Sequence, residues 1–237
     1  MAESENCCCF PRPLGEDTYV HWSRMDFGWE NGCHIAVIGA SGTGKTSLVN
    51  ALRGYRNGEH GAAPVGRSSG TTREIHKSLL SDRTPVWVHD IPSVDMDTVG
   101  KVGFFKQYLL GLYDCVVVVY SGWLQPVDLR IIEACDYRRV SVCLVRTQSD
   151  RYMRKIMEDW VAWSVDMAKD SLSRDARNDV DEAFKKADLP DKLKRDVYHI
   201  NKNGLYGYVT LGQSGQFGVH EDCFVERLHS FKRPYEF

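Results

Sequence analysis

Eight consecutive residues, from Gly39 to Thr46, constrain the fold of this chain more than any other stretch. They read GASGTGKT, which fits the Walker A pattern of a glycine-rich loop that ends in lysine and a hydroxyl residue. The loop follows an apolar segment at residues 33–38 that is typical of a buried strand. It precedes residues 47–53, whose apolar positions have helical spacing. Strand, loop and helix in this order predict a loop that binds phosphate groups.

The chemistry of this loop follows from its residue types. Glycines let the backbone turn so that successive N–H groups point at phosphate oxygens, and the helix that follows presents its free N–H groups to the same anion. Lys45 is expected to reach the β- and γ-phosphates, and the hydroxyl of Thr46 is expected to ligate Mg²⁺. The predicted phosphate-binding residues are Gly39, Ala40, Ser41, Gly42, Thr43, Gly44, Lys45, Thr46 and Ser47.

Strand-like and helical segments alternate along the rest of the chain. This alternation predicts an α/β fold with a mostly parallel six-stranded sheet, one antiparallel edge strand supplied by a hairpin, and helices on both faces. We assign residues 1–32 to an N-terminal tail and lead-in, 33–231 to the nucleotide-binding domain and 232–237 to a C-terminal tail. Strands are predicted at 33–38, 74–80, 85–89, 115–120, 140–145 and 197–200, and helices at 47–53, 102–112, 127–137, from 151, at 176–187 and at 224–231.

Ligands of such sheets bind where parallel strands end. Asp90 follows one predicted strand directly, at a place that suits a carboxylate that helps to hold Mg²⁺. Thr147, Gln148 and Asp150 follow another strand and are the candidate base-reading residues. A carboxylate here can accept hydrogen bonds from N1–H and the 2-amino group of guanine, a donor pair that adenine lacks. Asn201 and Lys202, after the last strand, are further candidates for the base pocket.

Residues 54–72 are rich in Gly, Ser and Thr and are predicted to form a long loop, which is usually functional beside a phosphate site. We expect either Thr71 or Thr72 to add a second hydroxyl to Mg²⁺ when the γ-phosphate is present. The sequence does not choose between the two threonines. The alternative is a solvated Ser/Thr-rich loop without this role.

Together these motifs resemble the immunity-related, interferon-inducible GTPases, over residues 33–231. The resemblance implies a Ras-like P-loop NTPase core, a GTP-binding domain that binds GTP and GDP with Mg²⁺. It also implies self-association across nucleotide faces, as a homodimer or a heterodimer with related GTPases, association with intracellular membranes, and a role in cell-autonomous innate defence. The motifs that carry it are the phosphate loop, Gly61-Ala62-Ala63, Gly70-Thr71-Thr72, Asp90-Ile91-Pro92-Ser93, Tyr113-Asp114 and the run from Val145 to Asp150.

The chain departs from the family pattern at two residues of the site. Ser93 stands where the family pattern has a glycine whose N–H contacts the γ-phosphate, and we expect its Cβ to hinder that contact. Gln148 replaces a lysine that lies along the base. From the resemblance we also expect the helical domain typical of the family to be missing or very reduced in this chain. Beside the reacting phosphate we expect Lys45, Thr71, Thr72 and Ser93, and no glutamine follows Ser93 to orient the attacking water, so hydrolysis is expected to be slow.

Two other functions remain open from the sequence. The first is a nucleotide-binding scaffold that hydrolyses little or no GTP and acts through protein contacts, which Ser93 and Gln148 favour. The second is a P-loop ATPase or kinase. The guanine-reading interpretation of Asp150 argues against it.

Composition bounds the location and the partners. The net charge of −2 gives no basic surface for nucleic acid, so no nucleic-acid partner is expected. No apolar stretch approaches the ~20 residues that span a bilayer. We expect a cytoplasmic protein, with peripheral association with intracellular membranes as a possibility. Cys7, Cys8 and Cys9 are either sites of S-acylation or part of an exposed tail without a role.

Overall fold

The computed structural model describes residues 24, 26, 28, 29, 32–65, 75–81, 85–99, 108–160 and 164–231. Its centre is a six-stranded sheet with the strand order β2-β3-β1-β4-β5-β6. Strand β2 is antiparallel to β3, and the other neighbours are parallel. This confirms the predicted sheet and its antiparallel edge strand. The strands are β1 (Cys33–Ile38), β2 (His76–Ser81), β3 (Val86–Asp90), β4 (Cys115–Tyr120), β5 (Ser141–Arg146) and β6 (Val197–His199).

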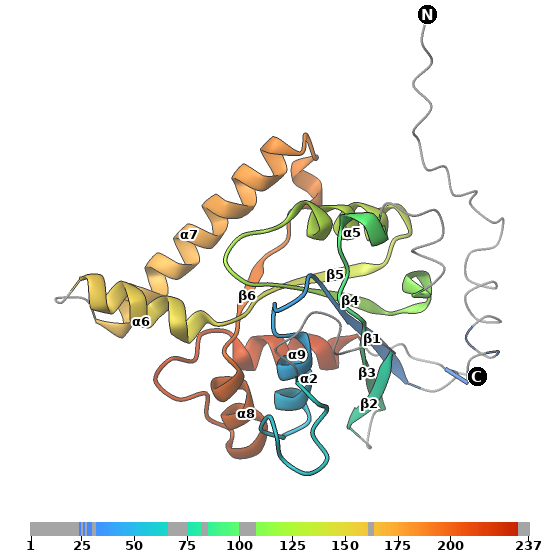
Figure 1. Ribbon diagram of the computed structural model, residues 1–237, viewed down its shortest axis with the longest axis horizontal. Helices are drawn as coiled ribbons and strands as arrows, with labels where there is room; N and C mark the ends of the chain where they lie inside the picture. The colour runs from blue at the N-terminus through green and yellow to red at the C-terminus, as the bar shows by residue number, and fades with distance from the viewer. Residues whose placement is uncertain are drawn as a thin grey trace, which may run out of the picture.

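Helices cover both faces of the sheet, as predicted (Figure 1). On one face, Ala36 and Ile38 of β1 belong to a buried cluster that includes side chains of α5 and α7. On the other face, Ile35 and Val37 share a buried cluster with α2, α8 and α9. The helices are α2 (Lys45–Leu52), α3 (Met96–Val99), α5 (Pro126–Tyr137), α6 (Ser149–Asp159), α7 (Val165–Lys186), α8 (Lys202–Leu211) and α9 (Glu221–Ser230), with the short 3-10 helices η1 (Leu110–Leu112) and η2 (Asp191–Leu193).

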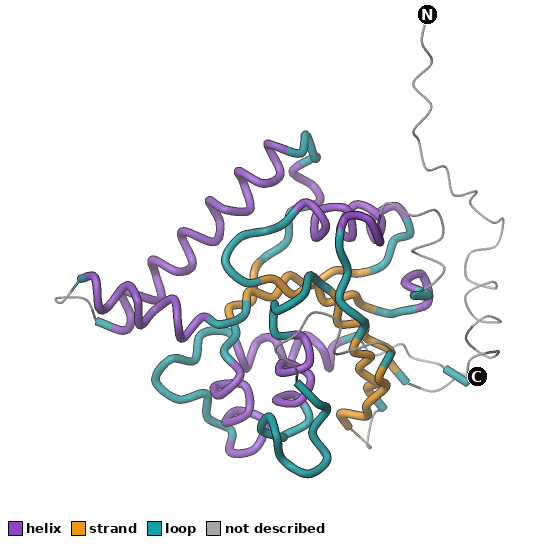
Figure 2. The backbone as a smooth tube through the Cα atoms, viewed as in Figure 1, coloured by secondary structure: helices purple, strands orange, loops and turns teal. Residues whose placement is uncertain are grey.

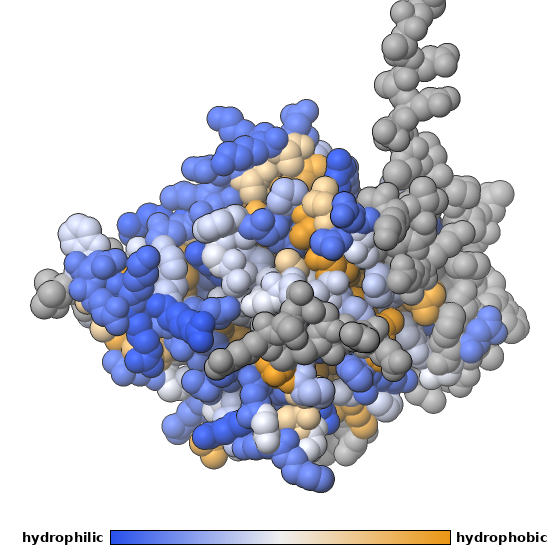
Figure 3. All heavy atoms as spheres, viewed as in Figure 1, coloured by the Kyte–Doolittle hydropathy of each residue, from blue (hydrophilic) through white to orange (hydrophobic). Residues whose placement is uncertain are grey.

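The strand register brings the predicted site residues to one edge of the sheet. Val37 lies opposite Asp90, and Ile38 lies beside Val118, so β1, β3 and β4 end close together. The connections that leave these carboxyl ends run as loops across this edge (Figure 2). In contrast, α6 and α7 form a hairpin that extends away from the sheet (Figure 1), and the face of this hairpin that Figure 3 shows is mainly hydrophilic.

Several helices differ from the sequence-based expectation, among them α8 and the predicted helix at 102–112. Helix α8 is not predicted, because Gly204 and Gly207 weaken the helical pattern. It forms because Asn201 caps it, accepting a hydrogen bond from the Gly204 N–H at 2.6 Å, and because it packs on α2. The predicted helix at 102–112 is wrong at its end, where Leu110–Leu112 is a 3-10 helix. Leu109, with φ 53°, has a left-handed backbone that an α-helix cannot continue through; residues 102–107 lie outside the described part.

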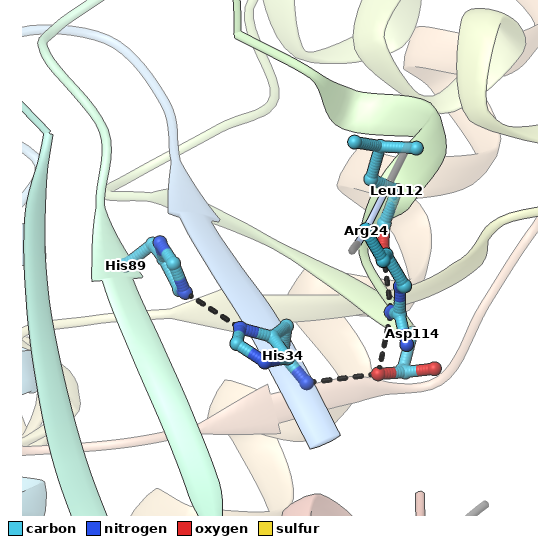
Figure 4. Close-up of polar contacts among 5 residues, drawn as sticks. All are labelled: Arg24, His34, His89, Leu112 and Asp114. Carbon is cyan, nitrogen blue, oxygen red and sulfur yellow. Dashed lines mark hydrogen bonds and ion pairs between the residues drawn. The ribbon is translucent and has the colours of Figure 1, made fainter. Parts of the chain in front are cut away.

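Two of the described residues before β1, Arg24 and Trp29, pack into the domain, and Figure 4 shows the contacts of Arg24. Arg24 is buried, donates to the Leu112 carbonyl from Nε at 2.7 Å, and forms an ion pair with Asp114 at 2.8 Å. The same Asp114 oxygen accepts the backbone N–H of His34 at 2.8 Å. Trp29 is also buried and stacks on the His34 ring, with 4.7 Å between centroids. Part of the predicted lead-in therefore belongs to the core.

Within the described ranges, no helix has both the length and the apolar character needed to cross a bilayer. The same residues contain no cluster of three or more His, Cys, Asp or Glu side chains that could hold a metal ion by themselves. A metal ion at the nucleotide site would therefore need ligands of another kind in addition, such as hydroxyls and phosphate oxygens.

Candidate functional site

The phosphate loop connects β1 to α2 in a conformation that requires glycine at two positions. Gly39 has φ 153°, and a Cβ there would lie 2.1 Å from the Val119 carbonyl oxygen of the neighbouring strand. Gly44 has φ 91° and occupies the N-cap position of α2, where no side chain caps the helix. The first N–H groups of α2 are thus left without the usual side-chain acceptor, which is the arrangement by which helices bind anions.

Lys45 lies at the centre of the loop with its ammonium group against three oxygens. Nζ donates to the carbonyls of Gly39 at 3.0 Å and Ala40 at 2.9 Å, and to Oγ of Ser93 at 2.9 Å. Burial lowers the pKa of Lys45 to about 8, and nearby Asp90 partly opposes this effect. An anion bound here would replace lost solvation and favour the charged form.

Thr46 and Asp90 are brought together as the sequence predicts for a magnesium site. The hydroxyl of Thr46 donates to Asp90 Oδ2 at 2.7 Å. Asp90 is fully buried, and burial raises its pKa, while the Thr46 hydrogen bond and Lys45 act in the opposite direction. Its Oδ1 has no hydrogen-bond partner among the described residues. A buried carboxylate oxygen and a hydroxyl, both hard oxygen donors, fit the chemistry of Mg²⁺.

The first part of the long loop is held against α2 by Asn50, which the sequence reasoning did not single out. Its side chain is fully buried, donates to the Ala63 carbonyl at 2.9 Å and accepts the Ala63 N–H at 2.8 Å. These two bonds hold the loop at the end of Gly61-Ala62-Ala63. Thr71 and Thr72 lie outside the described residues, so their predicted role as magnesium ligands stays a prediction.

The predicted base-reading segment is attached directly to the phosphate loop. The hydroxyl of Thr147 donates to the Thr43 carbonyl at 2.6 Å, and its backbone N–H donates to the Tyr120 carbonyl at 2.9 Å. Gln148 has a left-handed backbone with φ 60° at the start of α6, and its side chain accepts from Arg151 at 3.1 Å. Asp150 is half-buried in the first turn of α6. The geometry therefore places this segment beside the phosphate loop, as predicted.

Asn201 and Lys202 are close in sequence but differ in environment. The side chain of Asn201 is buried and fully used within the fold, because it caps α8 and donates to the Phe217 carbonyl and to Glu221, both at 2.9 Å. Lys202 is exposed. A backbone bond of 3.5 Å from the Ser149 N–H to the Ile200 carbonyl joins this loop to the base-reading segment. Asn201 thus shapes the neighbourhood, and its predicted contact with the base stays untested.

Asp128 is a second buried carboxylate near Lys45 that the sequence reasoning missed. It lies in the first turn of α5, where Oδ2 accepts the Gln125 N–H at 2.9 Å in a capping box. Burial raises its pKa to about 6, although the Gln125 N–H and Lys45 oppose the shift. The Gln-Pro-Val-Asp run was the available signal, since a polar N-cap followed by Pro and then Asp is typical of a helix start.

Comparison with known proteins connects this site to one family. A model of the interferon-inducible GTPase (IIGP) family matches residues 29–193, which is more than half of the chain. The chain belongs to the interferon-inducible GTPase family. The matched region includes the phosphate loop, Asp90 and the base-reading segment, and it also includes Trp29 from the lead-in.

Relatives with a curated description agree with the family. T-cell-specific guanine nucleotide triphosphate-binding protein 2 of Mus musculus is 30% identical over 120 residues, which cover 49% of this chain and 28% of that protein. Interferon-inducible GTPase 1 of Mus musculus is 27% identical over 117 residues, with the same shares of coverage. The chain thus matches less than a third of the length of these relatives.

A solved structure supports the fold independently. A variant of Era from Aquifex aeolicus bound to GDP and AlF4⁻ superposes with a TM-score of 0.51 at 17% identity. The superposition covers 87% of this chain and 58% of the Era chain. At this identity the likeness concerns the fold alone. That fold is the G-domain fold of P-loop GTPases.

Proposed function

We propose that this chain is a guanine-nucleotide-binding protein that hydrolyses GTP slowly with Mg²⁺. The observation that carries the proposal is the phosphate loop itself, in which an uncapped helix N-terminus, the Lys45 ammonium and the contact between Thr46 and Asp90 converge. Each of these groups has a separate task in binding a nucleoside triphosphate. Membership of the interferon-inducible GTPase family supports GTP as that nucleotide.

The residues divide the work in a simple way. Backbone N–H groups of residues 39–46 bind the phosphate oxygens, and Lys45 stabilises negative charge on the β- and γ-phosphates. Thr46 and Asp90 would hold Mg²⁺, which when bound neutralises charge shared by these two phosphates. Thr147 fixes the base-reading segment to the loop, so that Asp150 can accept from guanine. No glutamine follows Ser93, which supports slow turnover.

Self-association through the nucleotide face, as a homodimer or with related GTPases, is the second part of the proposal. Its support is the missing water-orienting glutamine, because a second subunit can supply a catalytic group that one chain lacks. A role in cell-autonomous defence, in the cytoplasm and peripherally on intracellular membranes, completes the proposal. Family membership is the support for that role.

A nucleotide-binding scaffold with little hydrolysis is the alternative, and one observation favours it. Ser93 contacts Lys45 directly at 2.9 Å, in the place where the family pattern has glycine. A single-turnover assay of GDP formation, at protein concentrations high enough for dimers, separates the two functions. Measurable turnover supports the GTPase, and complete absence of turnover supports the scaffold.

Nucleotide binding is tested with Lys45→Ala. Calorimetric titration with GTP, GDP and ATP, with and without Mg²⁺, is expected to show guanine-nucleotide binding by the original chain. Lys45→Ala should weaken it by roughly 100-fold, because charge-assisted bonds to two phosphates are lost.

The matched control is Lys185→Ala, which removes an exposed lysine on α7. It should leave the affinity unchanged. Absence of any uptake of GTP or GDP by the original chain would contradict the proposed function, and preference for ATP would contradict the assignment of Asp150.

A further inference from the structure

The ammonium group of Lys45 already has as many acceptors as it has hydrogens. An ammonium group carries three N–H donors. Its three acceptors are the carbonyls of Gly39 and Ala40 and the hydroxyl of Ser93, all at 2.9 or 3.0 Å. A further acceptor can bind Lys45 at full strength only by displacing one of these oxygens.

The Ser93 oxygen differs from the other two in its origin. The carbonyls of Gly39 and Ala40 belong to the phosphate loop, whereas Ser93 lies three residues beyond Asp90 in the segment that follows β3. Asp90 contacts Thr46, so this segment approaches Lys45 from the side of the predicted magnesium ligands. That is the side on which the terminal phosphate of a nucleoside triphosphate is expected. The β-phosphate, which a diphosphate also carries, is instead held mainly by the loop N–H groups.

The segment that carries Ser93 is fixed by bonds of its own. The N–H of Ile91 donates to the Val37 carbonyl at 3.0 Å, and the N–H of Val94 donates to the Gly39 carbonyl at 3.3 Å. Both Ile91 and Val94 are buried. Ser93 does not have a positive φ, so its side chain causes no backbone strain at this position. The serine hydroxyl is therefore held against Lys45 by an unstrained, anchored turn.

We propose that the Ser93 hydroxyl is an internal competitor of the γ-phosphate for Lys45, and that it makes the site select nucleoside diphosphate over triphosphate. The proposal rests on the proposed function, because it presumes that guanine nucleotides bind here. The proposal has a consequence for the segment after β3. Without a γ-phosphate, both Ser93 and Val94 bond this segment to the phosphate loop, whereas with a γ-phosphate only the Val94 bond remains.

The hydroxyl and the Cβ of Ser93 are separated by two substitutions. Ser93→Ala removes the hydroxyl and keeps the Cβ, and Ser93→Gly removes both. Affinities for GDP and for the non-hydrolysable analogue GMPPNP are measured by calorimetry with Mg²⁺. We expect the original chain to prefer GDP, and Ser93→Ala to shift the ratio by about tenfold towards the analogue, the effect of one hydrogen bond to a charged group. The affinity for GDP should change less than about threefold, which is below the effect of one such bond.

Ser141→Ala is the matched control. This serine is exposed at the start of β5, at the opposite end of the strands from the site, and its loss should leave the ratio unchanged. Thermal unfolding of each variant checks that the fold is intact.

Hydrogen exchange gives a second readout that a purely structural role would not change. The peptide that contains residues 91–98 is expected to exchange faster in the original chain with GMPPNP than with GDP, because the γ-phosphate takes the place of the Ser93 hydroxyl on Lys45. In Ser93→Ala this difference between the two nucleotides should disappear, because no hydroxyl is left for the γ-phosphate to displace.

Three outcomes would overturn the competitor proposal while leaving the proposed function intact. The first is equal binding of GDP and GMPPNP by the original chain, and the second is loss of GMPPNP affinity in Ser93→Ala. The third is a shift of the affinity ratio towards GMPPNP in Ser93→Gly but not in Ser93→Ala. The second would mean that the hydroxyl donates to the γ-phosphate, and the third that the Cβ is the obstacle. Failure of the original chain to bind GDP would instead overturn the proposed function, and the competitor proposal with it.

Discussion

At the scale of single residues, two buried carboxylates near the Lys45 ammonium group determine the electrostatics of the site. Asp90 and Asp128 are both fully buried, and both act on Lys45, whose pKa burial would otherwise lower further. Burial also raises the pKa of each carboxyl group, since a charged form loses its hydration. Asp90 has a task in the proposed chemistry. Asp128 has a helix-capping task that a neutral side chain can also perform.

Asp128→Asn should flatten the pH dependence of stability. The pKa of Asp128 is raised from 3.8 to about 6 in the fold, so the stability it contributes is complete below pH 3.8 and is lost as the pH rises through 6. Asparagine keeps an oxygen for the Gln125 N–H and does not ionise. The variant's free energy of unfolding, relative to the original chain, should therefore rise by about 2 kcal/mol between pH 4.5 and 7. Urea denaturation at the two pH values measures it.

Asp128→Ala supplies the comparison. It removes the cap as well as the charge, so it should cost about 1 kcal/mol more than Asp128→Asn at both pH values. If the difference in free energy of unfolding between Asp128→Asn and the original chain does not change with pH, the raised pKa of Asp128 is contradicted.

Residues fixed by a local motif were predictable, and residues fixed by the tertiary fold were not. The phosphate loop and Asp90 were found because the Walker A pattern and the end of a strand identify them from sequence alone. Asn50 and Glu221 were missed because their roles depend on partners 13 and 20 residues away, Ala63 and Asn201. Ser93 was identified, but its contact with Lys45 was not, since no pattern says which way a serine hydroxyl turns.

At the scale of elements, a pair of histidines joins β1 to β3 beneath the lead-in (Figure 4). His34 Nδ1 and His89 Nε2 are 3.0 Å apart, so one ring nitrogen donates and the other accepts. Trp29 lies against both rings, at 4.7 and 4.6 Å between centroids. Burial, followed by His34, Lys77 and Arg24, lowers the pKa of His89 to about 3. The packing of these elements therefore requires a neutral His89.

His89→Gln should reduce the loss of stability in mild acid. The lowered pKa means that the contribution of His89 is present above its ordinary value of 6.5 and is lost as the pH falls towards 3. From pH 7.5 to 5.5 the unfolded chain gains a proton that the folded chain does not, which costs about 1.4 kcal/mol. Glutamine does not titrate, so His89→Gln should lose about 1.4 kcal/mol less free energy of unfolding over this pH range than the original chain. Urea denaturation of both proteins at the two pH values measures these free energies.

His199→Gln provides an independent repeat. Burial and His220 lower the pKa of His199 to about 3 as well, in a separate cluster on β6. In a double variant the effects of the two substitutions on the pH dependence of the free energy of unfolding should add, because the effects of distant sites are usually additive. An unchanged pH slope in both single variants would contradict the requirement for neutral histidines.

Strands were easier to predict than helices in this chain. All six strands were expected within a few residues, because buried runs such as 115–120 are apolar and β-branched and are bounded by turns. Helix α8 was missed because its stability comes from the Asn201 cap and from packing on α2, which outweigh two glycines. The start of α7 at Val165 was also missed, since its first turns pack on α6 rather than on the sheet.

At the scale of the whole molecule, the fold brings four distant segments to one edge of the sheet. Segments at Gly39, Asp90, Thr147 and Asn201 lie at the ends of β1, β3, β5 and β6, and because these strands run parallel within one sheet, the segments share one edge. This convergence could be predicted, because it follows from topology alone. The packing of the lead-in could not, since an isolated Arg24 in an irregular segment gives no periodic signal.

Arg24→Met tests whether the segment before β1 is part of the cooperative fold. The Arg24–Asp114 pair is almost fully buried, with 1% and 3% of the two side chains exposed. Methionine keeps much of the volume but leaves the Asp114 carboxylate without its cation. We expect the free energy of unfolding to fall by about 3 kcal/mol, as for other broken buried ion pairs, with a single transition in circular dichroism. Arg130→Met is the control, because Arg130 also pairs at 2.8 Å, with Glu133, but is exposed, and it should cost no more than about 0.5 kcal/mol.

A double-mutant cycle shows whether the cost of Arg24→Met belongs to the ion pair or to the docking of the whole segment. Asp114→Asn alone removes the anion and keeps an oxygen for the His34 N–H. If the pair dominates, the double variant should be less destabilised than the sum of the single variants by about 1–3 kcal/mol, because the second substitution removes the charge that the first left buried. Additive costs would mean that Arg24 acts mainly through its bonds to the Leu112 carbonyl. In that case the lead-in would be held by the carbonyl bonds and by Trp29, and the charge on Asp114 would have no part in it.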